Sequence, residues 1–311
     1  MSHYGTSRHN HRTIDGCASE LKHFVLARYS VAHERHPDRN EDSLIADEYS
    51  GLAAVFDGVG GSAAGEIASR TAAHATLESW RQTLQRVQQG RLARGFLDYC
   101  DKIDLPACLE GLIEQADDLV RTEGAKRAGT DDLATTVALS TLCQLPSQKG
   151  YTMFHAHVGD SRIYLLRGNE PLKRLTSDDG LLGKLVENKI IAETDALRID
   201  QAMRIEDLTE VELSYFRLRG GITQALGGPV PPTIHTSQTT IYPGDRVLLC
   251  TDGIHDNLTD QEIADILKIG ARTSVARILV ERALERSRQE RYTTIRAKPD
   301  DMTAVVITCR F

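Results

Sequence analysis

Short apolar runs of strand length recur along this chain, and two of them lead to an aspartate that is followed by glycine. Residues 52–56 lead into Asp57, and residues 246–250 lead, after one threonine, into Asp252. A strand is a rigid element that fixes the position of the carboxylate at its end, and the glycine lets a ligand approach the backbone closely. The pattern therefore predicts a β-rich scaffold that presents acidic side chains at the ends of buried strands.

Further runs of β-branched and other apolar residues, separated by polar turns, predict more strands. We expect strands at residues 23–32, 43–56 (with a turn at Ser50-Gly51), 135–142, 151–158, 161–166, 172–175, 239–242, 246–250 and 302–309. The first two runs are predicted to be neighbouring strands. The four successive runs between residues 135 and 175 predict antiparallel pairing, because short connections join antiparallel neighbours.

Helical spacing of apolar residues follows the second strand run and returns in three later segments. The first helix is predicted to begin at Ser62 as its N-cap, and the second at Asp104. Thr259 and Glu262 have the spacing of a capping box, which predicts the start of a third helix. A further helix is expected over residues 274–288.

Runs of strands separated by paired helices predict an α+β domain rather than an alternating parallel array. Residues 1–21 carry no apolar period and are predicted to form a flexible polar tail. The stretch from Asp178 to Arg219 is charged, irregular and helical in parts, which indicates an insertion over one edge that could act as a mobile flap. No linker rich in Pro, Gly or Ser divides the remainder, so residues 22–311 are predicted to form a single domain.

Composition and missing motifs exclude several classes of protein. No apolar run of the 311-residue chain approaches the roughly 18 residues that a membrane span needs. The net charge of −7 argues against nucleic acid, whose binding needs Lys and Arg concentrated on one face. The chain has no C-x5-R loop and no G-x4-G-K-[ST] motif, which excludes a thiol phosphatase and a P-loop kinase. Six scattered cysteines without a charged-then-apolar leader predict a reducing, cytoplasmic setting.

Three more aspartates, Asp42, Asp160 and Asp300, stand where a predicted strand meets a turn. Taken singly, each is compatible with an ordinary turn, in which Asp and Gly are common. Carboxylates that cluster at one point repel each other, so such a cluster is stable mainly when divalent cations hold it. Ligands that are all oxygen atoms favour Mg²⁺ or Mn²⁺ over Zn²⁺. Convergent acidic strand ends would therefore form a magnesium or manganese site.

The residues around these aspartates resemble, block by block and in the same order, the metal-dependent protein phosphatases of the PP2C (PPM) family, bacterial branch. The matching blocks are Asn40-Glu41-Asp42-Ser43, residues 55–61 and 64–69, Ala134-Thr135-Thr136, residues 157–165, 222–228 and 249–254, and Asp300-Asp301-Met302-Thr303. The resemblance extends from about residue 22 to the C-terminus. Each block alone is only moderately specific, but the ordered series argues against coincidence.

The resemblance implies a fold and a metal centre. The implied fold is a central antiparallel β-sandwich with helices on both outer faces, in αββα layers. The implied centre holds two Mg²⁺ or Mn²⁺ ions at one end of the sandwich, with a third, weaker metal in bacterial members. By motif position, the implied metal residues are Asp57 bridging the two ions, Asp252 and Asp300 on one ion, the Gly58 carbonyl on the other, Glu41 and Asp42 on metal-bound waters, and Asp160 with Asp252 at the third site.

The chemistry that the resemblance implies follows from charge. A phosphate monoester is an anion, and two cations about 3.5 to 4 Å apart neutralise its oxygens and lower the pKa of a bridging water, giving hydroxide. Asp57, Asp252 and Asp300 are thus the expected catalytic residues, and no covalent phosphoenzyme is needed. No residue is assigned as the general acid. His155 and His157, two apart on a predicted strand, are more typical of packed histidines than of catalysts.

Two departures from the family pattern bear on function. Five residues before Asp42, where the family usually places a phosphate-binding arginine, this chain has Pro37. Arg35 and Arg39 flank that position, and either could bind the substrate phosphate or form only an exposed salt bridge. After the last metal-binding aspartate the family usually has asparagine, whereas Asp301 would either tighten metal binding or face solvent.

The leading hypothesis is a Mg²⁺- or Mn²⁺-dependent phosphatase that acts on phosphoserine and phosphothreonine in proteins, because Asp57, Asp252 and Asp300 are intact. Its partners would be phosphorylated protein substrates and a cognate Ser/Thr kinase, which implies a role in signalling. Because Pro37 stands where arginine is expected, a second hypothesis stays open. It is a catalytically weak pseudophosphatase that binds a phosphoprotein or a kinase as a regulatory module.

Overall fold

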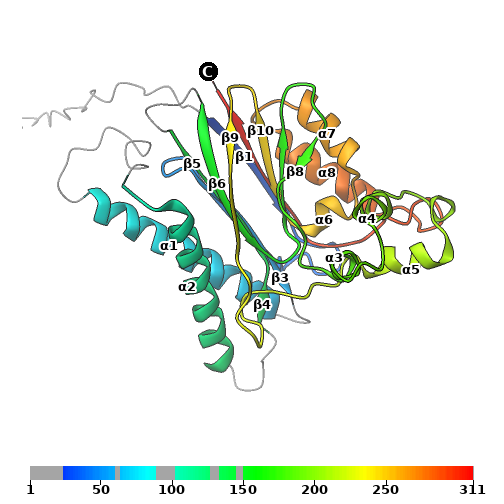
Figure 1. Ribbon diagram of the computed structural model, residues 1–311, viewed down its shortest axis with the longest axis horizontal. Helices are drawn as coiled ribbons and strands as arrows, with labels where there is room; N and C mark the ends of the chain where they lie inside the picture. The colour runs from blue at the N-terminus through cyan, green and yellow to red at the C-terminus, as the bar shows by residue number, and fades with distance from the viewer. Residues whose placement is uncertain (1–23, 60–63, 89–101, 127–132, 145–149, 311) are drawn as a thin grey trace, which may run out of the picture.

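The computed structural model describes residues 24–59, 64–88, 102–126, 133–144 and 150–310. Figure 1 shows these residues as a ribbon coloured from the N-terminus to the C-terminus. The predicted tail at residues 1–21 and the predicted N-cap at Ser62 lie outside the described residues.

Two antiparallel β-sheets form the centre of the fold (Figure 1). The strand order in the first sheet is β1 (Phe24–Val31), β11 (Met302–Cys309), β10 (Arg246–Cys250), β7 (Arg162–Leu166) and β8 (Lys173–Arg174). The order in the second sheet is β2 (Asp42–Asp47), β3 (Leu52–Val59), β5 (Val137–Cys143), β6 (Tyr151–Val158) and β9 (His235–Ile241), and the short β4 (Ala134–Thr135) pairs with β3. Each strand pair in these orders is antiparallel.

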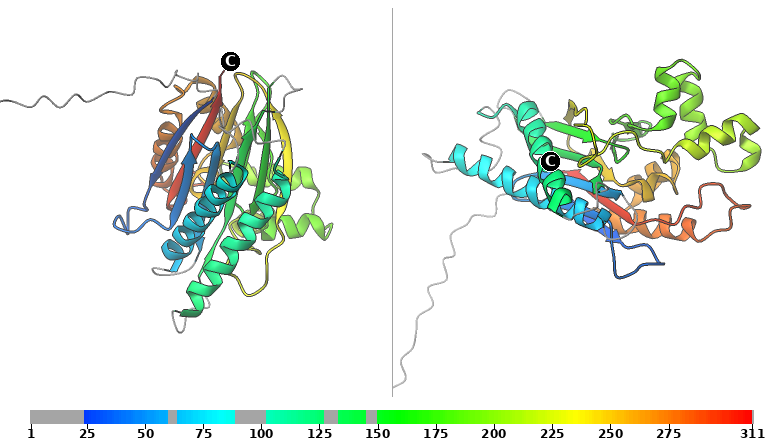
Figure 2. Two further views of the ribbon diagram at one scale, coloured as in Figure 1. Left: turned by 90° about the vertical axis from the view of Figure 1, so that its left-hand side faces the viewer. Right: turned by 90° about the horizontal axis from the view of Figure 1, so that it is seen from below.

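Helices cover the outer face of each sheet, as the two views in Figure 2 show. The helices α1 (Ala64–Gln88) and α2 (Leu105–Lys126) pack on the second sheet, and α7 (Asp260–Ile269) and α8 (Val275–Ser287) pack on the first. The other helical elements in the described ranges are α3 (Leu181–Glu187), α4 (Glu193–Asp200), the 3-10 turn η2 (Ile205–Asp207), α5 (Glu210–Leu218) and the four-residue α6 (Asp252–His255). None of the described helices is long and apolar enough to cross a membrane.

The side chains of β3 show how the layers are held together. Leu52, Ala54 and Phe56 pack with residues of α1 and α2, whereas Ala53 and Val55 pack with residues of the first sheet. Successive residues of a strand point to opposite faces, so a strand covered on both sides needs apolar residues at every position. The predicted α+β fold, an antiparallel β-sandwich with helices on both outer faces, is confirmed.

Two predicted strand pairings are wrong. The strands β1 and β2 are not neighbours, because β1 pairs with β11 in the first sheet and β2 pairs with β3 in the second. Likewise β6 and β7 do not pair, because β6 lies between β5 and β9 while β7 lies between β10 and β8. In both cases the chain crosses from one sheet to the facing sheet. A short connection serves a hairpin or such a crossing equally well, and the apolar pattern of the strands is the same in both.

Gly159 makes the crossing from β6 to β7 possible. Its φ is +94°, a conformation that residues with a side chain rarely adopt. A Cβ atom at this position would also lie 2.7 Å from Cβ of Thr136 on the neighbouring chain segment. The tight crossing leaves Asp160 at the end of the sandwich, where the two sheets are joined.

Capping contacts confirm several predicted helix boundaries. The carboxylate of Asp104 accepts a hydrogen bond at 3.2 Å from the N–H of Ala107, in the first turn of α2. Thr259 and Glu262 form the predicted capping box at the start of α7. Where the sequence predicts a turn at Asp252, the chain forms the short helix α6 instead.

Candidate metal centre

The pairing of β2 and β3 places two aspartates side by side. Asp42 and Asp57 are directly opposite each other in the antiparallel register, and such residues project from the same face of a sheet. Asp42 is buried and accepts a hydrogen bond at 2.8 Å from the hydroxyl of Thr251. The carbonyl of Asp57 accepts hydrogen bonds at 2.8 Å from the hydroxyl of Thr135 and from the N–H of Thr136. The carboxylate of Asp42 and the backbone of Asp57 are therefore held in place.

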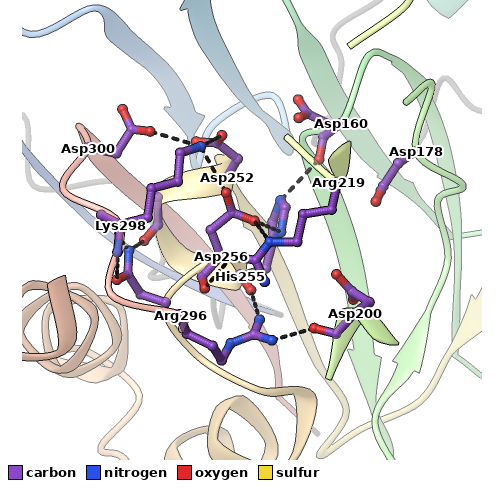
Figure 3. Close-up of polar contacts among 12 residues, drawn as sticks. Asp160, Asp178, Asp200, Arg219, Asp252, His255, Asp256, Arg296, Lys298 and Asp300 are labelled. Carbon is purple, nitrogen blue, oxygen red and sulfur yellow. Dashed lines mark hydrogen bonds and ion pairs between the residues drawn. The ribbon is translucent and has the colours of Figure 1, made fainter. Parts of the chain in front are cut away.

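The first sheet contributes two more aspartates. Asp252 follows β10 and begins α6, and Asp300 precedes β11, the antiparallel neighbour of β10. Gly253 allows these segments to approach closely, because a Cβ atom there would lie 2.0 Å from the carbonyl oxygen of Asp301. The ammonium group of Lys298 joins the two carboxylates, at 2.5 Å from Asp252 Oδ2 and 3.1 Å from Asp300 Oδ2 (Figure 3).

The carboxylates of the two sheets lie close enough to perturb one another. Burial raises the pKa of Asp57 well above its ordinary value, and the charge of Asp252 is the next largest cause. The further acidic contributors are Asp42, Asp300 and Asp160. Burial, followed by repulsion from Asp252, also raises the pKa of Asp160 well above its ordinary value and that of Asp300 to about 7. The other four aspartates that the sequence predicts as metal ligands thus lie within electrostatic range of Asp57. Among the described residues, however, no group of three or more Asp, Glu, His or Cys side chains is arranged to hold a metal ion.

The chemistry of this donor set fits divalent cations. Burying several ionised carboxylates together is costly, and the raised pKa values of Asp42, Asp57 and Asp160 express that cost. Bound cations remove the cost, because they neutralise the carboxylates without protonating them. Carboxylate and carbonyl oxygens are the ligands that Mg²⁺ and Mn²⁺ prefer. The kind of ligand atom present, rather than the arrangement of the side chains in this structure, therefore fits the two ions that the sequence predicts.

The loop before β2 brings Glu41 against Gly58. The N–H of Gly58 donates a hydrogen bond at 3.0 Å to the carbonyl of Glu41. A Cβ atom on Gly58 would lie 2.2 Å from the carbonyl oxygen of Gly65, so no larger residue fits. Among the described residues the buried Oε1 of Glu41 accepts no hydrogen bond, although Arg39 Nε lies 3.1 Å away. Glu41 Oε1 is therefore engaged in an ion pair with Arg39 rather than in a hydrogen bond.

The two candidate phosphate-binding arginines differ in their surroundings. The side chain of Arg39 is 32% exposed and forms its ion pair with Glu41 at the edge of the acidic cluster. The side chain of Arg35 is exposed. The structure therefore brings Arg39, but not Arg35, against a residue of the predicted metal centre.

Asp301 supports the loop that carries Glu41. Its carboxylate is buried and accepts hydrogen bonds from the backbone N–H groups of His33, at 2.5 Å, and Glu41, at 2.7 Å. The expectation that Asp301 could face solvent is therefore wrong. Since both oxygens are engaged by backbone donors, this residue positions the loop between β1 and β2.

Sequence reasoning missed the ion pairs behind Asp252. The ammonium of Lys298 lies 2.8 Å from Asp256 Oδ2, and the other oxygen of Asp256 lies 3.3 Å from Arg219 Nε (Figure 3). Burial alone would raise the pKa of Asp256, but Arg219 and Lys298 hold it below its ordinary value. One signal was present in the sequence, because Asp256 follows Asp252 at the four-residue spacing of one helix face.

Arg162 anchors the predicted flap segment, residues 178–219, to β7. Its buried guanidinium lies 2.6 Å from Asp178 Oδ2 and 3.1 Å from Asp200 Oδ2. Burial opposes ionisation of both aspartates, yet Arg162 lowers their pKa values below the ordinary value. A cavity of about 160 Å³ lies beside these ion pairs, lined also by Arg174 and Arg219. No residue of the predicted metal centre lines this cavity, so it is separate from the acidic cluster.

Two curated relatives share most of this chain. Over 285 residues the chain is 28% identical to the serine/threonine protein phosphatase PstP of Mycobacterium tuberculosis, an alignment that covers 91% of this chain and 45% of PstP. Over 245 residues it is 23% identical to the serine/threonine phosphatase stp of Listeria monocytogenes, covering 79% of this chain and 82% of the relative. The chain thus spans less than half of the length of PstP.

Solved structures and a family profile agree with these relatives. The crystal structure of PstP/Ppp from Mycobacterium tuberculosis has a TM-score of 0.68 at 26% identity, covering 93% of this chain and 99% of that one. The catalytic domain of PstP in complex with 2 manganese ions has a TM-score of 0.63 at 26% identity, covering 93% and 100%. The profile described as Protein phosphatase 2C matches residues 31–290. This chain therefore belongs to the protein phosphatase 2C family.

Proposed function

We propose that this chain hydrolyses phosphoserine and phosphothreonine in proteins with the help of two Mg²⁺ or Mn²⁺ ions. The observation that carries the proposal is the convergence of Asp57, Asp252 and Asp300 from two different sheets. Family membership supports it, as do two relatives described as serine/threonine phosphatases and the PstP structure with 2 manganese ions. Its partners would be phosphoprotein substrates and the Ser/Thr kinase that produces them.

We assign the metal-binding roles by motif position and by place in the fold. When bound, two such ions would neutralise the charge of the phosphoryl oxygens and lower the pKa of water. Asp57, Asp252, Asp300 and the Gly58 carbonyl would hold the two ions, Glu41 and Asp42 would accept hydrogen bonds from water around them, and Asp160 with Asp252 would hold a third, weaker ion. The place of Glu41 beside Gly58 and its ion pair with Arg39 support this division.

The side chains around Asp57 favour direct attack by water. The hydroxyls of Thr135 and Thr136 already form hydrogen bonds with the Asp57 carbonyl and with Ser161, at 2.8 Å each. Cys250, two residues before Asp252, is fully buried, and burial raises the pKa of its thiol. These groups are therefore poor nucleophiles. The chain's carboxylates would instead orient water for attack on phosphorus, with no covalent intermediate.

Arg39 is the better candidate for holding the substrate phosphate. Its guanidinium stands beside Glu41, whereas Arg35 is exposed. Arginine binds phosphate oxygens in a bidentate manner, and a half-buried guanidinium is already partly desolvated. We therefore assign Arg39 to the role that the family usually gives to an arginine at the position of Pro37.

Hydrolysis of a phosphothreonine peptide by the full chain with Mn²⁺ tests the proposal. Replacing Asp57 by Ala should lower kcat/KM by more than about 100-fold, because metal ions supply several kcal/mol of transition-state stabilisation. The matched control is Asp265→Asn, which changes an exposed aspartate on α7 whose carboxylate accepts a hydrogen bond from Gln261. Release of no phosphate at high enzyme concentration, or release that Asp57→Ala leaves unchanged, would refute the proposal.

A regulatory pseudophosphatase is the second candidate. The observation that favours it is the ammonium of Lys298, which already binds two carboxylates needed by a metal ion. Such a protein would bind phosphopeptides, with Arg39 contacting the phosphate, and release no product. Phosphopeptide binding measured by fluorescence anisotropy, together with phosphate release over hours, distinguishes the two candidates.

A further inference from the structure

Lys298 binds three carboxylates at once. Its ammonium lies 2.5 Å from Asp252 Oδ2, 2.8 Å from Asp256 Oδ2 and 3.1 Å from Asp300 Oδ2. Its side chain is 35% exposed, so the flexible stem reaches the cluster from the surface. Figure 3 shows the ammonium between Asp252 and Asp300 on one side and Asp256 on the other.

The three carboxylates belong to two groups. Asp252 and Asp300 are proposed ligands of one divalent ion, and their Oδ2 atoms are the atoms that contact Lys298. Asp256 has no proposed metal role. Its side chain is 4% exposed, and its Oδ1 atom lies 3.3 Å from Arg219 Nε. Arg219 also donates a hydrogen bond at 2.9 Å to the backbone carbonyl of Asp256. Arg219 therefore fixes the position of Asp256 through both its side chain and its backbone carbonyl.

A metal ion and the ammonium compete for the same oxygens. A divalent cation bound by Asp252 and Asp300 would lie within a few ångströms of the present ammonium position, and like charges at that distance repel strongly where water is scarce. The lysine stem has four rotatable bonds, and one of its three carboxylates lies outside the metal set. Nζ can thus leave Asp252 and Asp300 while it keeps its ion pair with Asp256.

We propose that Lys298 is an internal counter-cation that holds Asp252 and Asp300 in the metal-free protein and withdraws to Asp256 when a divalent ion binds. This inference rests on the metal centre of the proposed function. Binding of the ion at Asp252 and Asp300 is then an exchange of one cation for another. The exchange weakens metal binding, and in return the carboxylates stay assembled when metal is scarce.

Calorimetric titration of the full chain with Mn²⁺, after removal of metal by a chelator, tests the exchange. The variant Lys298→Met removes the charge and keeps the length of the side chain. We expect it to bind at least one Mn²⁺ about tenfold or more tightly, which corresponds to about 1.4 kcal/mol. Lys298→Arg should bind Mn²⁺ as weakly as the natural chain. The matched control is Lys268→Met, because Lys268 is an exposed lysine on α7 and its replacement should change nothing.

Thermal unfolding supplies a readout that is independent of binding heat and of activity. Without Mn²⁺, Lys298→Met should unfold at a lower temperature than the natural chain, because Asp252 and Asp300 then repel each other without a counter-cation. Saturating Mn²⁺ should raise the unfolding temperature more in the variant than in the natural chain, since tighter binding to the folded state stabilises it more. Circular dichroism before heating establishes that each variant is folded.

A second variant keeps the test decisive if Lys298→Met does not fold. Asp256→Asn removes the negative charge to which Lys298 withdraws and keeps the shape of the side chain. We expect it to bind Mn²⁺ more weakly than the natural chain, which is opposite to the effect of Lys298→Met. Unchanged Mn²⁺ affinity in both variants would overturn the inference.

The outcomes separate this inference from the proposed function. If Lys298→Met binds Mn²⁺ more tightly than the natural chain does, the exchange is supported. If the natural chain binds Mn²⁺ but releases no phosphate, the proposed activity is refuted. Equal Mn²⁺ affinity in both proteins, with normal hydrolysis, would refute the exchange alone. If neither protein binds Mn²⁺, both ideas fail.

Discussion

Asp42 and Asp57 lie directly opposite each other in the antiparallel register of β2 and β3. Like charges directly opposite in a sheet destabilise it, yet both residues stand at the end of the sandwich where Asp252 and Asp300 also arrive. The local fold therefore holds an arrangement that is unfavourable for folding and suited to binding divalent cations. Because the site lowers stability in order to bind cations, substitutions in it should change stability and activity in opposite directions.

Removal of one charge from this pair should separate stability from function. Asp57→Asn keeps the shape of the side chain and removes its repulsion with Asp42 and Asp252. In the presence of a chelator we expect the free energy of unfolding to rise by on the order of 1 kcal/mol, as is common when a strained functional site is relieved. Phosphopeptide hydrolysis should fall at the same time. Urea denaturation with chelator measures the first effect, and a lower free energy of unfolding would contradict the repulsion that we describe.

The ionisation of Asp300 should make stability depend on pH when metal is removed. Burial, then Asp252, raises the pKa of Asp300 to about 7, above the value of about 3.9 expected in the unfolded chain. The folded state therefore binds more protons than the unfolded state between about pH 4 and pH 7. The contribution of Asp300 to the free energy of unfolding is therefore present below this pH window and is lost as the pH rises through it.

Comparison with Asp300→Asn isolates that contribution from those of other groups, such as the buried His155. In the presence of a chelator, the free energy of unfolding of the natural chain minus that of the variant should fall from pH 5 to pH 7.5. Saturating Mn²⁺ should reverse the trend, because Mn²⁺ binds the ionised carboxylate. A difference that does not change with pH under chelation would show that Asp300 titrates normally.

The two flanking arginines should differ in their effect on substrate binding. Arg39→Ala should raise KM for a phosphopeptide by about tenfold, since a charge-assisted hydrogen bond contributes about 1.5 to 3 kcal/mol and part of it is lost to solvent screening. Arg35→Ala serves as the matched control and should change KM little, because Arg35 is exposed. Steady-state kinetics on both variants decides the assignment. The reverse order of effects would transfer the phosphate-binding role to Arg35.

Asp301 should matter for folding more than for metal binding. Asp301→Ala leaves the N–H groups of His33 and Glu41 without their acceptor, which should cost about 3 kcal/mol of unfolding free energy. Asp301→Asn retains one acceptor oxygen and should cost less. Urea denaturation gives the stability, and metal analysis of the same samples should still find the stoichiometry of the natural chain. Loss of one metal ion without loss of stability would make Asp301 a ligand instead.

Local signals in the sequence determined much of the fold. The capping box of Thr259 and Glu262, the N-cap Asp104 and the strand at residues 302–309 each depend on neighbours within a few positions, and each is confirmed. The aspartates that end strands were also visible, and their motif blocks identify the family. These features are set by backbone hydrogen bonds and side-chain periods that one short stretch of chain contains.

Tertiary structure decided what these elements contact. The pairing of β1 with β11, and the crossing at Gly159, depend on which apolar faces meet in a two-sheet core, and strands buried on both faces show no preference in sequence. The links of Lys298 with Asp252 and of Asp301 with His33 join residues far apart in the chain. Ion pairs and buried acceptors of this kind arise only when the whole fold removes them from water together.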